Sequence, residues 1–231
     1  MEEFKYVGEE LHLFKFANNW KTYWTNEILK SVSNIEYLVE IGSGIGSNFN
    51  NLSKIGQKYL GIEPDKKLVD VAVREYGNFF ECGTVDSLPL GVHPDALVYI
   101  DVLEHIQDDW SEIYKASASL RNGGFLIVVV PAHMMLYSDF DRSVGHFKRY
   151  SLEDLKKFES DNLRIIKLRE IDSIGYLISR IGKYLSISKE VSLLTIKFWD
   201  FLIPISKRID NWKFVKFKRG KSIICIYKKY E

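Results

Sequence analysis

Three glycines at alternate positions, Gly42, Gly44 and Gly46, are the first residues of this 231-residue chain whose spacing indicates a binding function. They follow an apolar, β-branched run at residues 37–41, which predicts a buried parallel strand. Without Cβ atoms, the backbone of such a turn can approach a ligand closely, and the helix that follows favours an electron-rich group at its N-terminus. Loops also use glycine for ordinary geometry, so the turn alone leaves a purely structural interpretation open.

Two carboxylates flank this turn in a way that a nucleotide-like ligand would explain. Glu63 follows the next apolar run, about 20 residues after the first glycine, where doubly wound folds place an acid on ribose hydroxyls. Glu40 lies in the first apolar run, where a buried charge is costly unless a cation, such as an ammonium group of the ligand, compensates it. Ser47 stands where the dinucleotide fingerprint requires glycine or alanine, so a nucleotide-binding oxidoreductase is the less favoured alternative.

The segments around these positions resemble motifs of class I S-adenosylmethionine-dependent methyltransferases. Residues 39–46 look like the first motif of that family, residues 63–65 like the second and residues 95–106 like the fourth. The resemblance extends to a bacterial subfamily, often fused to glycosyltransferases, through five further segments: 8–11, 19–21, 131–133, 145–150 and 220–223. It implies S-adenosyl-L-methionine as the cofactor, S-adenosyl-L-homocysteine as the product, and methyl transfer as the reaction.

The resemblance also indicates which residues bind the cofactor. Asp86, in the loop after the third strand, is the nearest match to the acid that often reaches the adenine amino group, although it could equally cap a helix. Asp101, at the end of the fourth strand, could meet the methionine ammonium group or a substrate hydroxyl. The expected cofactor-binding residues are Glu40, Gly42, Ser43, Gly44, Gly46, Glu63, Pro64, Thr84, Asp86 and Asp101, together with Trp20 from an N-terminal lid.

Histidines and an aspartate are the candidates for proton transfer. Methylation of a hydroxyl requires its oxygen to lie in line with the methyl group and another group to accept its proton. A histidine that titrates near neutral pH and is oriented by a carboxylate fits the second task. The candidates are His105, His133, Asp141 and His146. His133 is slightly favoured because His146 could instead bind an anionic group, and each candidate could also serve only to hydrogen-bond its loop. The five histidines show no metal-binding spacing, so no metal is expected.

These residues must be positioned by a sheet whose strand ends converge. Apolar runs alternate with helical patterns, and this rhythm is typical of a parallel sheet covered on both faces. We therefore expect an α/β fold with a doubly wound, seven-stranded, mostly parallel sheet of the Rossmann-like methyltransferase type. Strands are expected at 37–41, 59–62, 79–82, 95–100, 125–130, 163–171 and 222–227, and helices at 47–56, 65–76 and 109–120.

We expect a single domain, residues 1–231, with two additions to the sheet. Residues 1–34 are rich in aromatic side chains and predict a helical lid, although plain core packing would explain them as well. Residues 35–172 would form the cofactor-binding core, and residues 213–231 the last strand. Residues 173–212 separate the last two strands and predict a helical hairpin, which could cap the substrate pocket, form a dimer surface or rest on a membrane.

Charge and composition limit the range of partners and locations. The net charge is +1, but residues 1–144 contain 12 basic and 21 acidic side chains, whereas residues 145–231 contain 20 and 10. The basic half could face an anionic acceptor or be only an uneven surface. Cys82 and Cys225 lie far apart in the sequence and are interpreted as core residues in a reducing compartment. The sequence shows neither an apolar leader nor a run of ~18 apolar residues, so a cytoplasmic location is expected.

The sequence thus predicts an O-methyltransferase acting on a sugar hydroxyl of a glycan or glycoconjugate, the acceptor that the resemblance implies. Fusion to or association with a glycosyltransferase would fit this acceptor, and no nucleic-acid partner is expected. A lipid or another small molecule is the alternative acceptor. A cofactor-binding module without turnover is a further alternative, disfavoured because His133 and His146 are both present in the matching motifs.

Overall fold

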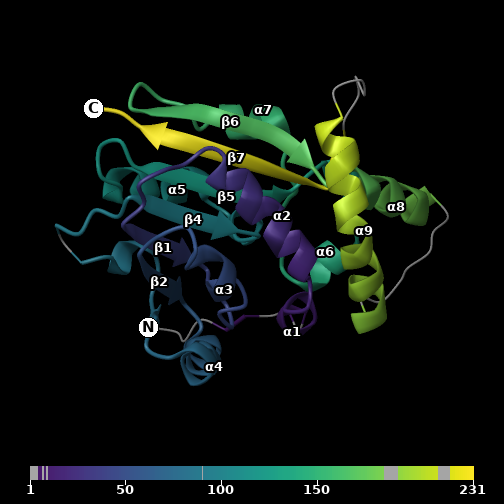
Figure 1. Ribbon diagram of the computed structural model, residues 1–231, viewed down its shortest axis with the longest axis horizontal. Helices are drawn as coiled ribbons and strands as arrows, with labels where there is room; N and C mark the ends of the chain where they lie inside the picture. Colours follow the sequence, from purple (N-terminus) through teal and green to yellow (C-terminus); the bar gives the residue numbers. More distant parts are fainter. Residues whose placement is uncertain (1–4, 7, 9, 90, 185–191, 213–218) are drawn as a thin grey trace.

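The apolar runs of the sequence form seven strands of one sheet in the computed structural model of this chain (Figure 1). The structure describes residues 5, 6, 8, 10–89, 91–184, 192–212 and 219–231. The strands are β1 (Tyr37–Ile41), β2 (Lys58–Glu63), β3 (Phe80–Cys82), β4 (Ala96–Ile100), β5 (Phe125–Pro131), β6 (Leu163–Ile171) and β7 (Ser222–Lys229). All seven overlap the predicted strands, because strands buried on both faces must be apolar along most of their length.

The strand order is β3-β2-β1-β4-β5-β7-β6. Strands β1 to β5 are parallel, whereas β7 runs antiparallel to both of its neighbours, β5 and β6. The order reverses between β1 and β4, which are hydrogen-bonded neighbours. Ligands of doubly wound sheets bind outside the carboxyl ends of the strands at such a switch point. The predicted fold class is confirmed.

Helices cover both faces of this sheet (Figure 1). Alternate residues of a strand point to opposite faces, so Leu38 packs in the core with α2 and α9, and Val39 packs in the core with α5 and α7. The α-helices are α1 (Leu11–Phe14), α2 (Asn18–Leu29), α3 (Phe49–Leu52), α4 (Lys66–Tyr76), α5 (Asp109–Ser119), α6 (Asp139–Ser143), α7 (Leu152–Lys156), α8 (Ser173–Tyr184) and α9 (Leu193–Asn211). Short 3₁₀ turns are η1 (Val85–Ser87), η2 (Leu103–His105) and η3 (Met134–Leu136).

Two sequence expectations differ from the structure. The helix expected at 47–56 is reduced to the single turn of α3, because asparagine and serine side chains in this stretch compete for backbone hydrogen bonds and favour turns. Cys225 is buried as expected, but Cys82 is exposed at the end of the edge strand β3.

The predicted additions to the sheet are both helical. α8 and α9 pack against each other between β6 and β7, as expected for the hairpin at 173–212. α2 packs on the sheet and on α9, with Tyr23, Trp24 and Ile28 buried. Parts of the predicted lid, hairpin and last-strand regions (residues 1–4, 7, 9, 185–191 and 213–218) lie outside the described residues. Within the described part of the chain, no helix is long and apolar enough to cross a membrane.

Candidate active site

A cavity of about 2280 Å³ opens at the carboxyl ends of β1 and β4. Part of its wall is the glycine turn after β1, and other parts come from η2, from α6 and from the hairpin helices α8 and α9. α1 and α2 contribute further side chains from the lid. Because it lies at the switch point of the sheet, this cavity is the candidate binding site.

The glycine turn presents backbone rather than side chains to the cavity. Its three glycines have φ angles of 71°, 54° and 74°, which residues with a Cβ rarely adopt. The N–H groups of Gly42 and Ser43 both donate to the carbonyl oxygen of Ile62, at 2.7 and 3.1 Å, and so tie the turn to β2. A Cβ at Gly44 would lie 3.4 Å from Cδ1 of Leu11, and both of these residues line the cavity. The lid therefore approaches the turn closely at Gly44.

Glu63 supplies a carboxylate next to this turn. It lines the cavity although its exposed fraction is only 5%. One carboxylate oxygen accepts the N–H of Gly44 at 2.9 Å, and the other accepts the N–H of Asp65 at 3.0 Å. Burial raises the pKa of Glu63, and these two backbone donors oppose that effect. Each oxygen keeps a second lone pair, so Glu63 can still accept two hydroxyl groups from a ligand. Pro64 and Thr84 also line the cavity.

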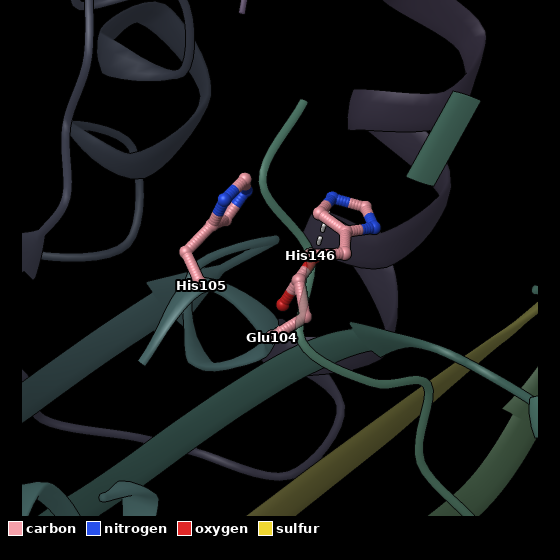
Figure 2. Close-up of side chains that lie close together, drawn as sticks. All are labelled: Glu104, His105 and His146. Carbon is pink, nitrogen blue, oxygen red and sulfur yellow. Dashed lines mark ion pairs between the residues drawn. The ribbon is translucent and has the colours of Figure 1, made fainter. Parts of the chain in front are cut away.

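Four ionisable side chains gather where β4 ends: Asp101, Glu104, His105 and His146, the last three of which are drawn in Figure 2. Asp101 has a φ of 54°, unusual for a residue other than glycine; its side chain is exposed to the cavity, where loss of hydration raises the pKa of its carboxyl group. Glu104 is 0% exposed, and burial together with Asp101 raises its pKa well above the usual range. Burial and the neighbouring His146 lower the pKa of His105 to about 4, so its imidazole is neutral at pH 7.

Asp141 fixes the orientation of His146. Oδ1 of Asp141 lies 2.9 Å from Nδ1 of His146, and Arg149 donates to both carboxylate oxygens, at 2.8 and 3.1 Å. Ser138 donates its N–H and its hydroxyl to Oδ2, both at 2.8 Å. Burial opposes ionisation, but the hydrogen bonds from His146 and Arg149 hold the pKa of Asp141 well below its usual range. An ionised Asp141 only accepts hydrogen bonds, so Nδ1 of His146 carries a proton and Nε2 is the basic nitrogen.

Residues 39–128 match the sequence model of a family described as a methyltransferase domain. This match includes the glycine turn, Glu63 and the strand end at Asp101. The protein is an S-adenosylmethionine-dependent methyltransferase. Its cofactor is S-adenosylmethionine.

Solved structures share the fold of this methyltransferase over most of its length. YcgJ of Bacillus subtilis superposes on 91% of this chain and 99% of its own, with a TM-score of 0.58 and 17% identity. An S-adenosylmethionine-dependent methyltransferase of Clostridium acetobutylicum superposes on 95% of this chain and 97% of its own, with a TM-score of 0.61 and 13% identity. The N-methyltransferase NodS of Bradyrhizobium japonicum, in complex with S-adenosylhomocysteine, superposes on 93% of this chain and 87% of its own, with a TM-score of 0.59 and 12% identity. No protein of curated function matches the sequence.

The cavity of the methyltransferase fits this cofactor. S-adenosylmethionine carries ribose hydroxyls, and Glu63 has two lone pairs left to accept them. Gly44 presents its backbone to the cavity beside Leu11 of the lid, so a ligand can lie against the turn without an intervening side chain of residue 44. The positively charged methionine end of the cofactor matches Asp101, which faces the same cavity. Of the expected cofactor-binding residues, those that line the cavity are Trp20, Gly42, Ser43, Gly44, Glu63, Pro64, Thr84 and Asp101.

Glu40 does not line the cavity, contrary to the sequence expectation. It is 1% exposed and accepts hydrogen bonds from the hydroxyl of Tyr59 and, at 2.8 Å, from the side-chain amide of Asn48. Burial raises its pKa to about 7, and these neutral donors oppose the shift. Through Asn48, at the N-terminus of α3, Glu40 holds the residues that follow the glycine turn. Gly46 likewise faces protein, because a Cβ there would meet Phe80.

Of the two expected cofactor-binding residues Asp86 and Trp20, only Trp20 lines the cavity. The carboxylate of Asp86 turns outward and accepts a hydrogen bond from Lys115 at 2.6 Å, so Thr84 rather than Asp86 lines the cavity from this loop. Trp20 lines the cavity as expected. It packs against Trp199 with ring centroids 5.6 Å apart, and its backbone N–H donates to Asp200 at 2.8 Å. The lid is thereby anchored on the hairpin helix α9.

His133, the slightly favoured base, is directed away from the cavity. It follows β5 with a φ of 63°, and its Nε2 lies 2.9 Å from Oε2 of Glu170 on β6. Its Nδ1 lies 3.5 Å from Arg219, and its ring packs against Tyr176. Both ring nitrogens thus face protein groups, and His133 is not among the described residues that line the cavity. The structure instead brings together His105 and His146, with ring centroids 4.6 Å apart, and Asp141 behind them.

Glu104 and Lys221 are two of the cavity residues that were not predicted as site residues. Glu104 lies one position before His105 and three after Asp101, and a helical turn places residues three apart on one face, so the spacing was a usable signal. Lys221 is brought to the cavity by the start of β7, where its ammonium group lies 4.7 Å from the ring centre of Trp199. Burial lowers its pKa. Lys221 belongs to the segment 220–223 that carries the resemblance, but spacing along the chain does not show that it meets Asp101 and Glu104 at the cavity.

Proposed function

We propose that this methyltransferase methylates a sugar hydroxyl of a glycan or glycoconjugate. The observation that carries the proposal is the Asp141–His146 pair, whose basic nitrogen belongs to the cluster at the cavity. A neutral amine can attack a methyl group without prior loss of a proton, whereas a hydroxyl group needs its proton removed as the oxygen attacks. An imidazole oriented by a carboxylate therefore favours an oxygen acceptor.

S-adenosylmethionine supplies a methyl group made electrophilic by its positively charged sulfur. Glu63 and the glycine turn hold its nucleoside part, so that the acceptor reaches the methyl group from the side of the cavity formed by η2, α6 and α8. On that side the group of Glu104, His105 and His146 removes the hydroxyl proton, and this step depends above all on His146. Ser179 and Lys183 of α8 line the same cavity, which supports a role of the hairpin in acceptor binding.

Cationic side chains of the cavity support an acceptor with an anionic group. Lys183 and Lys221 line it, and so does Arg142, which is paired with the exposed Asp139. Arg149 lines it too, but its guanidinium is engaged by Asp141. A phosphate or carboxylate on the glycan would be attracted by this set of charges.

The outer surface of the hairpin supports an acceptor that is carried on a lipid. Four apolar side chains of α9 are exposed at helical spacing and form one stripe: Leu194, Phe198, Phe201 and Ile205, with exposed fractions of 80, 62, 70 and 45%. Among the described residues of α8 and α9, the exposed charged side chains are basic, whereas Asp200 and Asp210 are buried. Exposed aromatic and aliphatic groups flanked by lysine and arginine match an anionic membrane surface. We therefore propose that the sugar is attached to a membrane-bound carrier and that this surface binds anionic lipid.

Incubation with methyl-labelled S-adenosylmethionine and a panel of free and lipid-linked glycans tests this function. We expect label on a sugar oxygen, located by mass spectrometry, and a preference for lipid-linked acceptors. His146→Gln should lower single-turnover methylation by about 10²–10⁴-fold, the usual contribution of general acid–base catalysis, while the affinity for S-adenosylhomocysteine stays the same. His93→Gln, at an exposed histidine on another loop, is the matched control. Label found only on amines, or a His146→Gln variant with the wild-type rate, would contradict the proposal.

A further inference from the structure

Three potential metal ligands from two separate segments meet beside the cavity (Figure 2). Glu104 and His105 belong to η2, and His146 follows α6. Each offers one donor atom, and the three atoms all lie within 4.8 Å of one another. In Figure 2 the carboxylate of Glu104 lies below the two imidazole rings, and a dashed line joins it to the ring of His146. The sequence could not reveal this set, because 40 positions separate His105 from His146.

The carboxylate of Glu104 is the observation that points to a ligand. The residue is 0% exposed, and neither carboxylate oxygen has a hydrogen-bond partner among the described residues. Nε2 of His146 lies 3.9 Å from its Oε1, which is too far for a hydrogen bond. A buried carboxyl group without a partner must either stay protonated or be paired with a cation, and even when protonated it leaves its polar atoms unsatisfied here. A small cation between Glu104 and the imidazoles would satisfy these atoms.

The surroundings of His146 are those of a metal ligand. A histidine bound to a metal through one nitrogen almost always donates its other ring N–H to a carboxylate or carbonyl oxygen, which fixes its orientation. Nδ1 of His146 is 2.9 Å from Asp141, which is itself held by Arg149. Nε2 is therefore left facing Glu104 and His105.

We propose that Glu104, His105 and His146 bind a divalent transition-metal ion. The three donor atoms lie within 4.8 Å of one another, and metal–nitrogen and metal–oxygen bonds of about 2.0–2.2 Å would draw them closer together around an ion. Two imidazoles and one carboxylate suit Zn²⁺, Fe²⁺ or Mn²⁺ better than Ca²⁺, which prefers six to eight oxygen ligands. Since three protein ligands leave further positions open to the cavity, the site can accept an oxygen of the acceptor.

The role of this ion rests on the proposed function. Coordination of the acceptor hydroxyl lowers its pKa, so its O–H bond breaks, its proton passes to solvent, and the oxygen attacks as an alkoxide. The new bond joins this oxygen to the methyl carbon, while the bond from carbon to sulfur breaks and leaves its electron pair on sulfur. In this form of the reaction His146 acts as a ligand, and no oxidant or reductant is needed.

Calorimetric titration of the chelator-treated full chain with ZnCl₂ and MnCl₂ tests the site, with CaCl₂ for comparison. We expect one transition-metal ion per chain, much tighter than Ca²⁺. Glu104→Gln and His105→Gln should each weaken binding by more than the ~10–100-fold typical of losing an outer partner of a ligand. His93→Gln should bind as the wild type does. Affinity for S-adenosylhomocysteine, measured on the same samples, shows that each variant is folded.

The absence of saturable binding by the wild type would overturn this site, as would binding that persists unchanged in both Glu104→Gln and His105→Gln. A different result would contradict the proposed function: the protein would bind the metal but methylate no glycan. Methylation of a glycan that is insensitive to chelation, together with no metal binding, would reject the metal site and leave His146 as the direct proton acceptor.

Discussion

Replacement of Asp141 by asparagine should separate the structural from the catalytic importance of the Asp141–His146 pair. Asp141 is 0% exposed and accepts five hydrogen bonds, two from Arg149, two from Ser138 and one from His146. The asparagine side chain would remove the negative charge and leave the guanidinium of Arg149, itself 8% exposed, without its partner. Breaking a buried ion pair by removing one member typically costs about 3–5 kcal/mol. We therefore expect Asp141→Asn to lower the free energy of unfolding by about that amount.

His146→Gln provides the contrast. It keeps the Asp141–Arg149 pair and removes only the imidazole, so it should lower the free energy of unfolding by about 1.5–3 kcal/mol, the range for one hydrogen bond to a charged group. Both variants should lose methyl transfer, but Asp141→Asn should lose more stability. Urea unfolding followed by circular dichroism at pH 7 measures the free energies. If Asp141→Asn costs less than about 1 kcal/mol, the pair does not hold this part of the site as we infer.

The pH dependence gives a second measure of the same pair. The pKa of Asp141 lies below its ordinary value of 3.8 in the folded protein. A depressed carboxyl pKa stabilises the fold above the unfolded-state pKa, and this stabilisation is lost as the pH falls below it. The difference in unfolding free energy between wild type and Asp141→Asn should therefore be constant between about pH 5 and 8 and shrink below about pH 4. A difference that grows on acidification would refute the assignment of Asp141 as an anion.

Glu63→Ala should weaken the affinity for S-adenosylhomocysteine by about 1.5–3 kcal/mol, the range for a hydrogen bond to a charged group. An unchanged dissociation constant by calorimetry would show that the ribose lies elsewhere. Glu40 has a folded pKa raised from 4.5 to about 7, so the stability linked to its protonated form is present below about pH 4.5 and lost as the pH rises through about 7. Glu40→Gln should therefore gain stability relative to the wild type as the pH rises from about 5 to 7, at up to about 1.4 kcal/mol per pH unit. If the unfolding free energies of the two proteins change in the same way with pH, the raised pKa of Glu40 is wrong. The methyltransferase should co-sediment with vesicles containing anionic phospholipid but not with neutral vesicles, and Phe198→Ser with Phe201→Ser should abolish this binding. Equal sedimentation of this double variant, or self-association of the wild type through the same helices, would remove the membrane from the proposed function.

Features determined by contiguous residues could be predicted from the sequence. The strands are apolar on both faces, and the glycine turn and Glu63 follow directly from two of them, so their place at the cavity was expected. α3 was overestimated because helical length depends on side chains such as Asn50 and Asn51 that favour turns. Helix or strand patterns could be recognised without knowledge of tertiary contacts.

Which histidine faces the cavity could not be predicted. His133 and His146 both follow elements that end near the site, but the backbone at His133 turns its ring towards Glu170, 37 positions later in the chain. Likewise, Asp86 is withdrawn by Lys115, and Glu104 is buried by segments distant in sequence. Such outcomes depend on contacts between elements, which spacing along one chain does not contain.

The position of β7 has a consequence for how this protein is made. β7 is the last strand in the chain, yet it is hydrogen-bonded to β5 on one side and to β6 on the other. During synthesis on the ribosome, β5 and β6 are therefore complete while each still has an unpaired edge, and unpaired edges are sites of aggregation. The hairpin α8–α9 is synthesised in this interval, so the nascent chain carries two open strand edges and an exposed apolar helix stripe at once. We expect this stage of synthesis to depend most on chaperones, and the sheet to close only when Ser222 to Lys229 leave the ribosome.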